Sequence, residues 1–298
     1  MTRTIWMAAL SVVLFGSFPI FSSAGGPSPQ RSDHDERPSL SRAEVPFELF
    51  NDHLIIVKGT IGPIENVNIV LDTGSSPTAI SRDTADRLSL RGNPQSLLMS
   101  NGSIDVQGAV LSSIQIGAFH AQLLRVIVQD LRFMQHKLGI PIGGIAGLDV
   151  LSTASFMIDY RKRKIVFEPI GTIRKAVPFE TRRPFLTVKA KIKGQEVRLL
   201  VDSGTSALLI YRTRLKTKLE QLSPERDPQL STSAGAISTR WCRASEVWLG
   251  SQSLGPQLIL ITDVDPDPRY NFDGLLGFVK LGFRKVWFDF ETGLFGWD

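Results

Sequence analysis

Two aspartates in this chain stand in the same short sequence pattern, and their type and spacing suggest acid–base chemistry. Asp72 begins the tetrapeptide Asp-Thr-Gly-Ser and Asp202 begins Asp-Ser-Gly-Thr, and each follows a run of apolar residues. A fold that brought the two carboxylates within about 3 Å would let them share one proton, so that one acts as a base and the other as an acid. One such tetrapeptide alone is weak evidence, because its residues are common ones.

The sequence around these aspartates repeats with a period of 130 residues. Residues 144–147, Gly-Ile-Ala-Gly, recur as residues 274–277, Gly-Leu-Leu-Gly, and Met157-Ile-Asp159 recurs as Trp287-Phe-Asp289. Ordered landmarks at one offset indicate two copies of one structural unit, and a period this long makes each copy a lobe. We therefore expect an N-terminal lobe over residues 44–170 and a C-terminal lobe over residues 171–298.

Each copy has the pattern of β-structure, which would determine how the aspartates are held. Short runs rich in Val, Ile, Leu and Phe alternate with Gly, Asn and Asp, as in strands separated by turns. The expected strands are residues 53–59, 66–71, 109–116, 121–128, 164–167, 185–192, 196–201, 245–249 and 257–261. Helices are expected over residues 81–90 and 212–222 and briefly after each Gly-x-x-Gly. The predicted fold class is mainly β, with barrel-like lobes and few short helices.

The doubled Asp-[Thr/Ser]-Gly-[Ser/Thr] motif, with one Gly-x-x-Gly downstream of each copy, resembles the aspartic protease superfamily. The resemblance extends from about Val45 to the C-terminus, and each copy is closer in size to a retropepsin-like subunit than to a pepsin lobe. It implies a bilobal acid-protease fold in which two retropepsin-like lobes, fused in one chain, are related by a pseudo-twofold axis. It also implies that Asp72 and Asp202 are the catalytic residues of an aspartic endopeptidase acting on extended polypeptide, with no metal or cofactor.

The chemistry of such a dyad explains the glycines beside it. Two carboxylates this close cannot both ionise, so the pair titrates as a unit. The ionised member takes a proton from a water that attacks the scissile carbonyl, while the protonated member hydrogen-bonds the developing oxyanion. Gly74 and Gly204 let the backbone pass close beneath the carboxylates, where a side chain would force them apart.

Four hydroxyl residues of the two motifs have orienting roles under the same resemblance. Thr73 and Ser203 match the positions whose hydroxyls tie the two loops together across the axis. Ser75 and Thr205 match the positions whose hydroxyls bond the outer carboxylate oxygens. None of the four is expected to act as a nucleophile.

Two further segments are candidate flaps that would close over a substrate. Pepsin-like enzymes carry a flap tyrosine, and the corresponding stretch of this chain has none. The polar tip Asn101-Gly102 predicts a glycine-bearing hairpin instead, and residues 231–237 offer a second hairpin with Gly235 at its tip. Such flaps would bind an extended peptide by strand pairing. Trp241 occurs in the second copy alone, as either a wall of the cleft or core, so the two sides of the cleft are expected to differ.

Other interpretations fit parts of the sequence. The Gly-x-x-Gly segments lack the Lys-[Ser/Thr] of a P-loop and the spacing of a Rossmann turn, so close backbone packing behind the aspartates explains them better. A periplasmic solute-binding protein would need two α/β lobes with many helices. A catalytically silent aspartic-protease fold used as a peptide-binding module stays open, although both aspartates and both adjacent glycines favour an enzyme.

The N-terminus has the composition of an export signal. Arg3 supplies a positive start, residues 5–21 are almost all apolar, and Ser22-Ser23-Ala24 offers small residues for cleavage. We expect residues 1–24 to be a signal peptide and the polar residues 25–43 a disordered linker. The protein would then be exported, periplasmic or secreted, with no stable membrane span after cleavage. An uncleaved anchor that tethers it to the membrane is the alternative.

Composition limits the remaining possibilities. The net charge of +5 includes a local cluster over residues 161–164 that is better explained as a solvated turn than as a nucleic-acid site. The single Cys242 excludes an intramolecular disulfide, and the four histidines lack metal-ligand spacing. We therefore expect a polypeptide substrate, no nucleic acid and no metal. An intramolecular dyad needs no dimer, so we expect a monomer.

Overall fold

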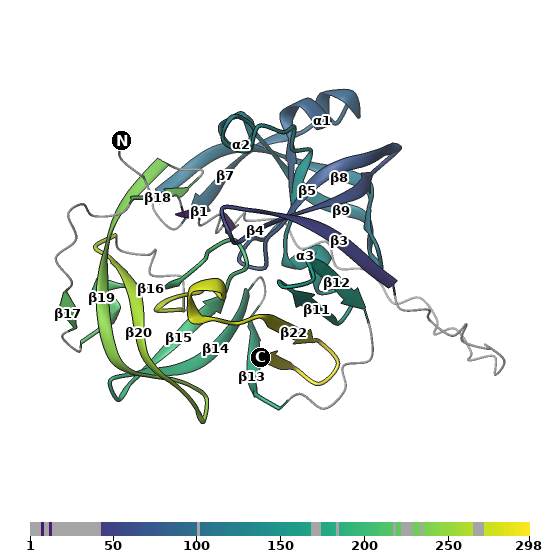
Figure 1. Ribbon diagram of the computed structural model, residues 1–298. Coiled ribbons are helices and arrows are strands. Elements are labelled where there is room, and N and C mark those ends of the chain that lie inside the picture. Colours follow the sequence, from purple (N-terminus) through teal and green to yellow (C-terminus); the bar gives the residue numbers. More distant parts are fainter. Residues whose placement is uncertain are drawn as a thin grey trace, which may run out of the picture.

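The structure is a computed structural model that describes residues 7–8, 12–13, 43–99, 102–167, 174–182, 185–216, 219–221, 229–232, 235–264 and 271–298. They form two β-rich lobes, the first drawn in purple to teal and the second in green to yellow (Figure 1). The prediction of a mainly β, bilobal chain is confirmed. Within the described residues, no helix has the length and apolar character needed to cross a membrane. Most of the predicted signal peptide and linker lies outside these residues.

The N-terminal lobe is a curved sheet with three short helices. Its strands are β3 (Ala43–Phe50), β4 (Leu54–Ile61), β5 (Ile64–Leu71), β6 (Ala79–Ser81), β7 (Asn93–Met99), β8 (Gly102–Ile116), β9 (Phe119–Gln129) and β10 (Gly144–Ala146). Its helices are α1 (Arg82–Arg87), α2 (Arg132–Leu138) and α3 (Leu148–Leu151). Strand alternation sends Ile55 and Val57 of β4 into one hydrophobic cluster and Leu54 and Ile56 into another, so this strand is buried on both faces.

The C-terminal lobe repeats this arrangement with fewer helical residues. Its strands are β13 (Ala176–Arg182), β14 (Phe185–Ile192), β15 (Gln195–Val201), β16 (Leu208–Tyr211), β17 (Glu220–Gln221), β18 (Gln229–Thr232), β19 (Gly235–Leu249), β20 (Gln252–Thr262) and β21 (Gly274–Leu276). Two 3₁₀ turns, Arg212–Arg214 and Val279–Leu281, stand where the first lobe has α1 and α3. Strand β21 pairs parallel with β15, as β10 pairs parallel with β5.

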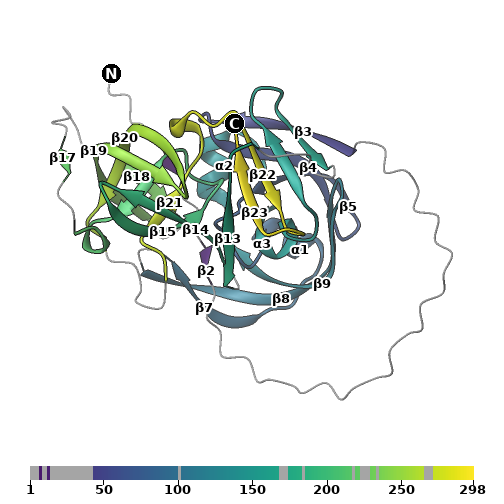
Figure 2. The same cartoon turned by 90° about the horizontal axis from the view of Figure 1, so that it is seen from below.

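A sheet shared by both lobes joins them. It consists of β3, β12 (Lys164–Phe167) and β11 (Phe156–Asp159) from one side and β22 (Lys285–Asp289), β23 (Leu294–Trp297) and β13 from the other. Antiparallel pairing of β11 with β22 sets Met157 opposite Trp287, so the repeated landmarks of the sequence meet at the seam. Figure 2 shows β22, β23 and β13 between the two lobes.

A short helical segment follows each Gly-x-x-Gly as predicted, and the helix predicted over residues 81–90 is present as α1, but the one predicted over residues 212–222 is not. Ser81 caps α1 by accepting a bond from Thr84 N at 3.2 Å, which helps this helix to begin. Tyr211 at the equivalent place offers no such cap, and only Arg212–Arg214 is helical in the described part of the predicted 212–222 helix. Helix α2 was not anticipated. The basic cluster over residues 161–164 lies largely in the exposed turn between β11 and β12.

Two further short strands come from the extreme N-terminus. Strand β1 (Met7–Ala8) pairs parallel with β18, and β2 (Val12–Val13) pairs antiparallel with β7. The partners β7 and β18 belong to the two candidate flaps, one in each lobe. Each flap hairpin therefore has an edge that accepts an additional extended segment.

The aromatic contact at the seam should be a main source of stability. The rings of Phe156 and Phe288 stack across the two lobes with centroids 4.6 Å apart, and both side chains are buried. We expect Phe156→Ala to lower the free energy of unfolding by about 3–5 kcal/mol through loss of burial and creation of a cavity. Urea denaturation measures this loss. Leu123→Ala, at a side chain that is 78% exposed, is the matched control and should change it by less than about 0.5 kcal/mol.

Candidate active site

Asp72 and Asp202 lie directly after β5 and β15, and both side chains are fully buried. Their backbone amides are held alike. Asp72 N donates to Ala146 O at 3.1 Å and Asp202 N donates to Leu276 O at 3.1 Å. These acceptors belong to the inserted strands β10 and β21, which begin with the first glycine of each Gly-x-x-Gly. The strand pairing therefore places the two aspartates equivalently in their lobes.

Two hydroxyl groups link the loops that carry the aspartates. Thr73 Oγ1 donates to Val201 O at 2.9 Å and accepts from Ser203 N at 3.0 Å. In return, Ser203 Oγ donates to Leu71 O at 3.2 Å and accepts from Thr73 N at 3.0 Å. The expected tie between the loops is therefore present. All four bonds are buried, so leaving any of these groups unpaired would cost about 1–3 kcal/mol.

The glycines of the two motifs bring the carboxylates together. Gly74 N donates to Asp72 Oδ1 at 2.9 Å, and Gly204 N donates to Asp202 Oδ1 at 2.7 Å. A Cβ atom on Gly74 would lie 2.6 Å from Asp202 Cγ, and a Cβ atom on Gly204 would lie 2.9 Å from Asp72 Cγ. Each carboxyl group therefore packs against the glycine of the opposite lobe. A side chain at either glycine would separate the pair.

The environment favours a proton on this pair. Burial raises the pKa of Asp72 well above its usual range, and the charge of Asp202 and a hydrogen bond to it raise the pKa further. The amides of Gly74 and Gly204 act in the opposite direction. Because two buried carboxylates this close cannot both be ionised, the pair holds one proton over a wide pH range. One oxygen can then accept a proton while another donates one.

Ser75 and Thr205 do not take the roles that were expected of them. Both hydroxyl oxygens are buried and have no hydrogen-bond partner among the described residues, so neither bonds a carboxylate oxygen here. The loop after Asp72 forms a tight turn here, in which Ser75 N donates to Asp72 O at 3.2 Å. The glycine amides hold the Oδ1 atoms of the two carboxyl groups instead. The expectation for these two hydroxyls is therefore wrong in this structure.

A support for the first loop was missed in the sequence. Asp149, in α3, accepts hydrogen bonds from Thr78 N at 2.9 Å and from Thr78 Oγ1 at 2.7 Å. Thr78 Oγ1 in turn accepts from Gly147 N at 3.0 Å. Burial raises the pKa of Asp149, and the bonds from Thr78 lower it. The sequence feature that could have indicated this support is the acidic residue two positions after the first Gly-x-x-Gly. Val279 takes the corresponding position of the second lobe, so this support exists on one side only.

The candidate flaps are hairpins. Strand β7 pairs with β8 so that Met99 faces Gly102, and β18 pairs with β19 so that Thr232 faces Gly235. Asn101 lies outside the described residues. Gly102 and Gly235 each begin the outgoing strand. Trp241 lies opposite Leu260 on β20, partly buried and packed against the hydrophobic cluster of the second lobe.

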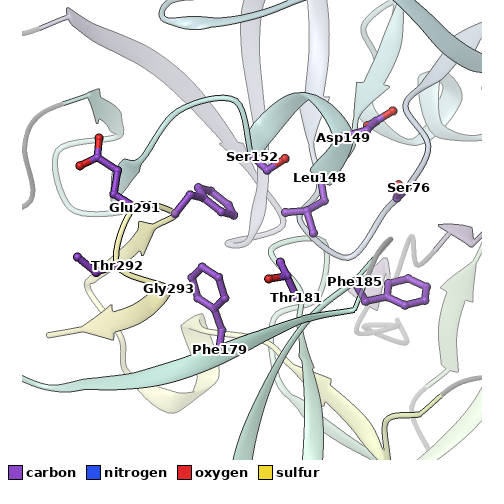
Figure 3. Close-up of a pocket in the computed structure, with 11 residues that line it drawn as sticks. Ser76, Leu148, Asp149, Ser152, Phe179, Thr181, Phe185, Glu291, Thr292 and Gly293 are labelled. Atoms are coloured by element: carbon purple, nitrogen blue, oxygen red, sulfur yellow. The ribbon is translucent and has the colours of Figure 1, made fainter. Parts of the chain in front are cut away.

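A cavity of about 820 Å³ opens beside the loop that follows Asp72, between residues of the two lobes (Figure 3). Ser76, four residues after Asp72, lines it together with Leu148 and Asp149 of α3. The second lobe contributes Phe179, Thr181, Phe185 and the turn Phe290–Gly293. Figure 3 shows the Thr181 side chain directed between Leu148 and Phe179. The cavity therefore combines apolar side chains with hydroxyl groups and with the carboxylates of Asp149 and Glu291.

Protonation of the dyad should be visible in stability. A carboxyl group whose pKa is raised on folding contributes stability at low pH that is lost as the pH rises above its unfolded value of about 3.9. Asp72→Asn removes this titration, so we expect it to stabilise the protein at pH 7 by more than about 0.5 kcal/mol, with a smaller effect near pH 4. Urea denaturation at the two pH values tests this. An equal effect at both would contradict the raised pKa of Asp72.

Comparison with known families agrees with this geometry. A family model described as "Aspartyl protease" matches residues 57–150 and 188–278, one region in each lobe and together more than half of the chain. A search of curated proteins finds no match. The two matched regions contain Asp72 and Asp202, the loops that follow them and both Gly-x-x-Gly segments. The chain is therefore a member of the aspartyl protease family, with one family region in each of its two lobes.

Proposed function

We propose that this protein is an aspartic endopeptidase whose catalytic residues are Asp72 and Asp202. The observation that carries the proposal is the buried pair itself, in which each carboxyl group lies against the glycine of the opposite motif. The hydroxyl ties through Thr73 and Ser203 hold the pair in place without a second chain. Membership of a protease family supports the same reaction class.

The proposed reaction uses the shared proton of the dyad. A water bound between the carboxylates attacks the scissile carbonyl carbon, and the ionised carboxylate takes the water's proton as the C–O bond forms. The protonated carboxyl group donates a hydrogen bond to the carbonyl oxygen as negative charge develops on it. The tetrahedral intermediate then collapses, the C–N bond breaks, and the leaving nitrogen receives a proton from the dyad. The dyad returns to its state with one proton.

The substrate class that fits this site is an extended polypeptide. Both flap hairpins have edges on which a short segment of this chain adds as a strand. A substrate in extended conformation would make the same backbone pairing and leave its side chains for the pockets on either side. The cavity at the seam, with Leu148, Phe179 and Phe290, suits an apolar or aromatic side chain.

Export is part of the proposal because the N-terminal sequence has the features of a signal peptide. The mature protein would act outside the cytoplasm, in the periplasm or after secretion. Membrane tethering through an uncleaved N-terminus is the alternative. Because both carboxylates come from one chain, the proposed active form is a monomer.

A catalytically silent peptide-binding module on the same fold is the second candidate function. It would use the flap edges and the pockets but not the dyad. The buried, proton-sharing pair favours the enzyme, because a binding module has no need of two carboxylates packed against each other at a cost in charge burial.

Replacing either catalytic carboxyl group tests the proposed enzyme. We expect Asp72→Asn and Asp202→Asn each to lower kcat/KM on an unfolded protein substrate at mildly acidic pH by at least about 100-fold, because an amide can neither accept nor share the proton. Asp130→Asn, the same substitution at an exposed carboxylate paired with Arg132, is the matched control and should have little effect. Turnover that persists in either dyad variant would exclude the dyad. Peptide affinity without turnover in the unaltered protein would favour the binding module.

The cavity at the seam gives a second test. Thr181 is exposed and lines the cavity, so Thr181→Trp should fill part of it without disturbing the core. We expect kcat/KM to fall about tenfold for peptides with a large apolar residue near the scissile bond, and less for matched peptides with alanine there. Thr181→Val, which nearly preserves shape, serves as the control. An equal fall for both peptides would show that the cavity does not hold that side chain.

A further inference from the structure

At one equivalent strand position, the long hairpin of the first lobe has a glycine and that of the second lobe has a tryptophan. Strands β8 and β9 of the first lobe have the same lengths as β19 and β20 of the second, at an offset of 133 residues. Gly108 on β8 therefore corresponds to Trp241 on β19. The tryptophan packs against the hydrophobic cluster of its lobe, whereas at the glycine the side chain of Gln95 lies against the strand.

A pocket of about 310 Å³ lies over Gly108. Its lining residues are Pro77, Arg91, Asn93, Gln95, Gly108, Ala109, Val110, Arg125 and Val126. The Gln95 amide lies against Gly108, because a Cβ atom on Gly108 would be 2.2 Å from Gln95 Nε2. Only glycine lets this side chain lie there. The second lobe thus has the Trp241 ring at this position. The first lobe has Gly108, with the carboxamide of Gln95 lying against it beside the pocket.

The pocket is connected to the proposed substrate cleft through the loop that leaves Asp72. Pro77 directly follows Ser76, and Ser76 lines the cavity at the seam. Asn93 and Gln95 of β7 and Gly108 of β8 also line the pocket, so it lies on the hairpin of the first candidate flap.

The chemistry of the lining points to one class of group. Two guanidinium groups, Arg91 and Arg125, and two carboxamides, Asn93 and Gln95, line the pocket, and no Asp or Glu lines it in the part of the chain that the structure describes. Guanidinium and amide N–H groups are the donors that recognise a carboxylate, through charge-assisted and often bidentate hydrogen bonds. Val110 supplies an apolar side for the aliphatic part of a ligand.

The second lobe does not offer the same lining. Val110 faces Arg125 across β8 and β9, and the corresponding pair on β19 and β20 is Arg243 facing Leu258. The charge is thus present in both lobes but on opposite strands. In the second lobe the position of Gly108 holds Trp241, which packs against the hydrophobic cluster of that lobe.

We propose that this N-lobe pocket binds an acidic side chain of the substrate and so sets the direction in which the peptide is read. The inference rests on the proposed peptidase function, whose cleft it extends. With a carboxylate subsite in one lobe only, a peptide with Glu or Asp at one fixed distance from the scissile bond binds in one orientation. The reversed peptide would bring the acidic residue to the Trp241 side.

Paired peptides test the proposal. In a set of otherwise identical peptides, each position on either side of the scissile bond holds Glu in one peptide and Gln in its partner, at a pH near 6, where Glu is ionised. We expect one position, on one side only, to show a kcat/KM roughly tenfold higher for Glu, with the ratio falling at high salt. In the Arg91→Gln/Arg125→Gln double variant this ratio should fall to about one. Arg243→Gln, at an exposed arginine of the second lobe, is the matched control and should keep the ratio.

The outcomes separate the inference from the proposed function. Cleavage with equal rates for Glu and Gln at every position would overturn the acidic subsite and leave the peptidase intact. A Glu preference that survives the double variant, or that disappears in Arg243→Gln, would also overturn it. If no peptide is cleaved, the proposed function fails, and the Kd of fluorescent Glu and Gln peptides then decides whether the pocket binds a carboxylate. A Kd ratio near one would reject it.

Discussion

The hydroxyls of Thr73 and Ser203 each bond to the backbone of the opposite lobe, and the rest of the site depends on this exchange. Burying two carboxyl groups face to face is unfavourable unless one of them keeps a proton and the backbone cannot move away. Four buried hydrogen bonds directly below the carboxylates supply this restraint. The shared sheet around Phe156 and Phe288 supplies a second restraint between the lobes.

The pseudo-symmetry is strict where the proton is held and weak elsewhere. The amide bonds to the two aspartates and the ties between the loops are nearly identical in the two lobes. The support from Asp149, by contrast, is given to the first loop only. In the second lobe, Val279 stands at the position of Asp149 and begins a 3₁₀ turn. The structural requirements of a dyad explain this difference, because both carboxylates must meet on one axis whereas the pockets around them need not match.

Much of this could be predicted from residue type and spacing. The 130-residue period indicated the two lobes, and the resemblance of the doubled motif to aspartic proteases implied the carboxyl pair. Details that depend on side-chain direction could not be read in the same way. Ser75 and Thr205 had the right chemistry, yet their buried hydroxyls make no hydrogen bond to the carboxylates among the described residues. The helix expected at 212–222 had a suitable composition but no cap at Tyr211. The correspondence of Gly108 with Trp241 stayed hidden, because the hairpins follow an offset of 133 and not 130.

That three-residue change of offset has a consequence for how such a molecule can diversify. In a dimer of identical subunits every substitution appears twice, and a change that helps one wall of the cleft is imposed on the other. Here the connection before the hairpin is three residues longer in the second lobe, and the connection after it is three residues shorter, so the aspartate loops stay aligned while the hairpins have separate histories. Fusing the two copies thus allows a tryptophan to arise on one wall while a glycine persists on the other, with the catalytic axis unchanged.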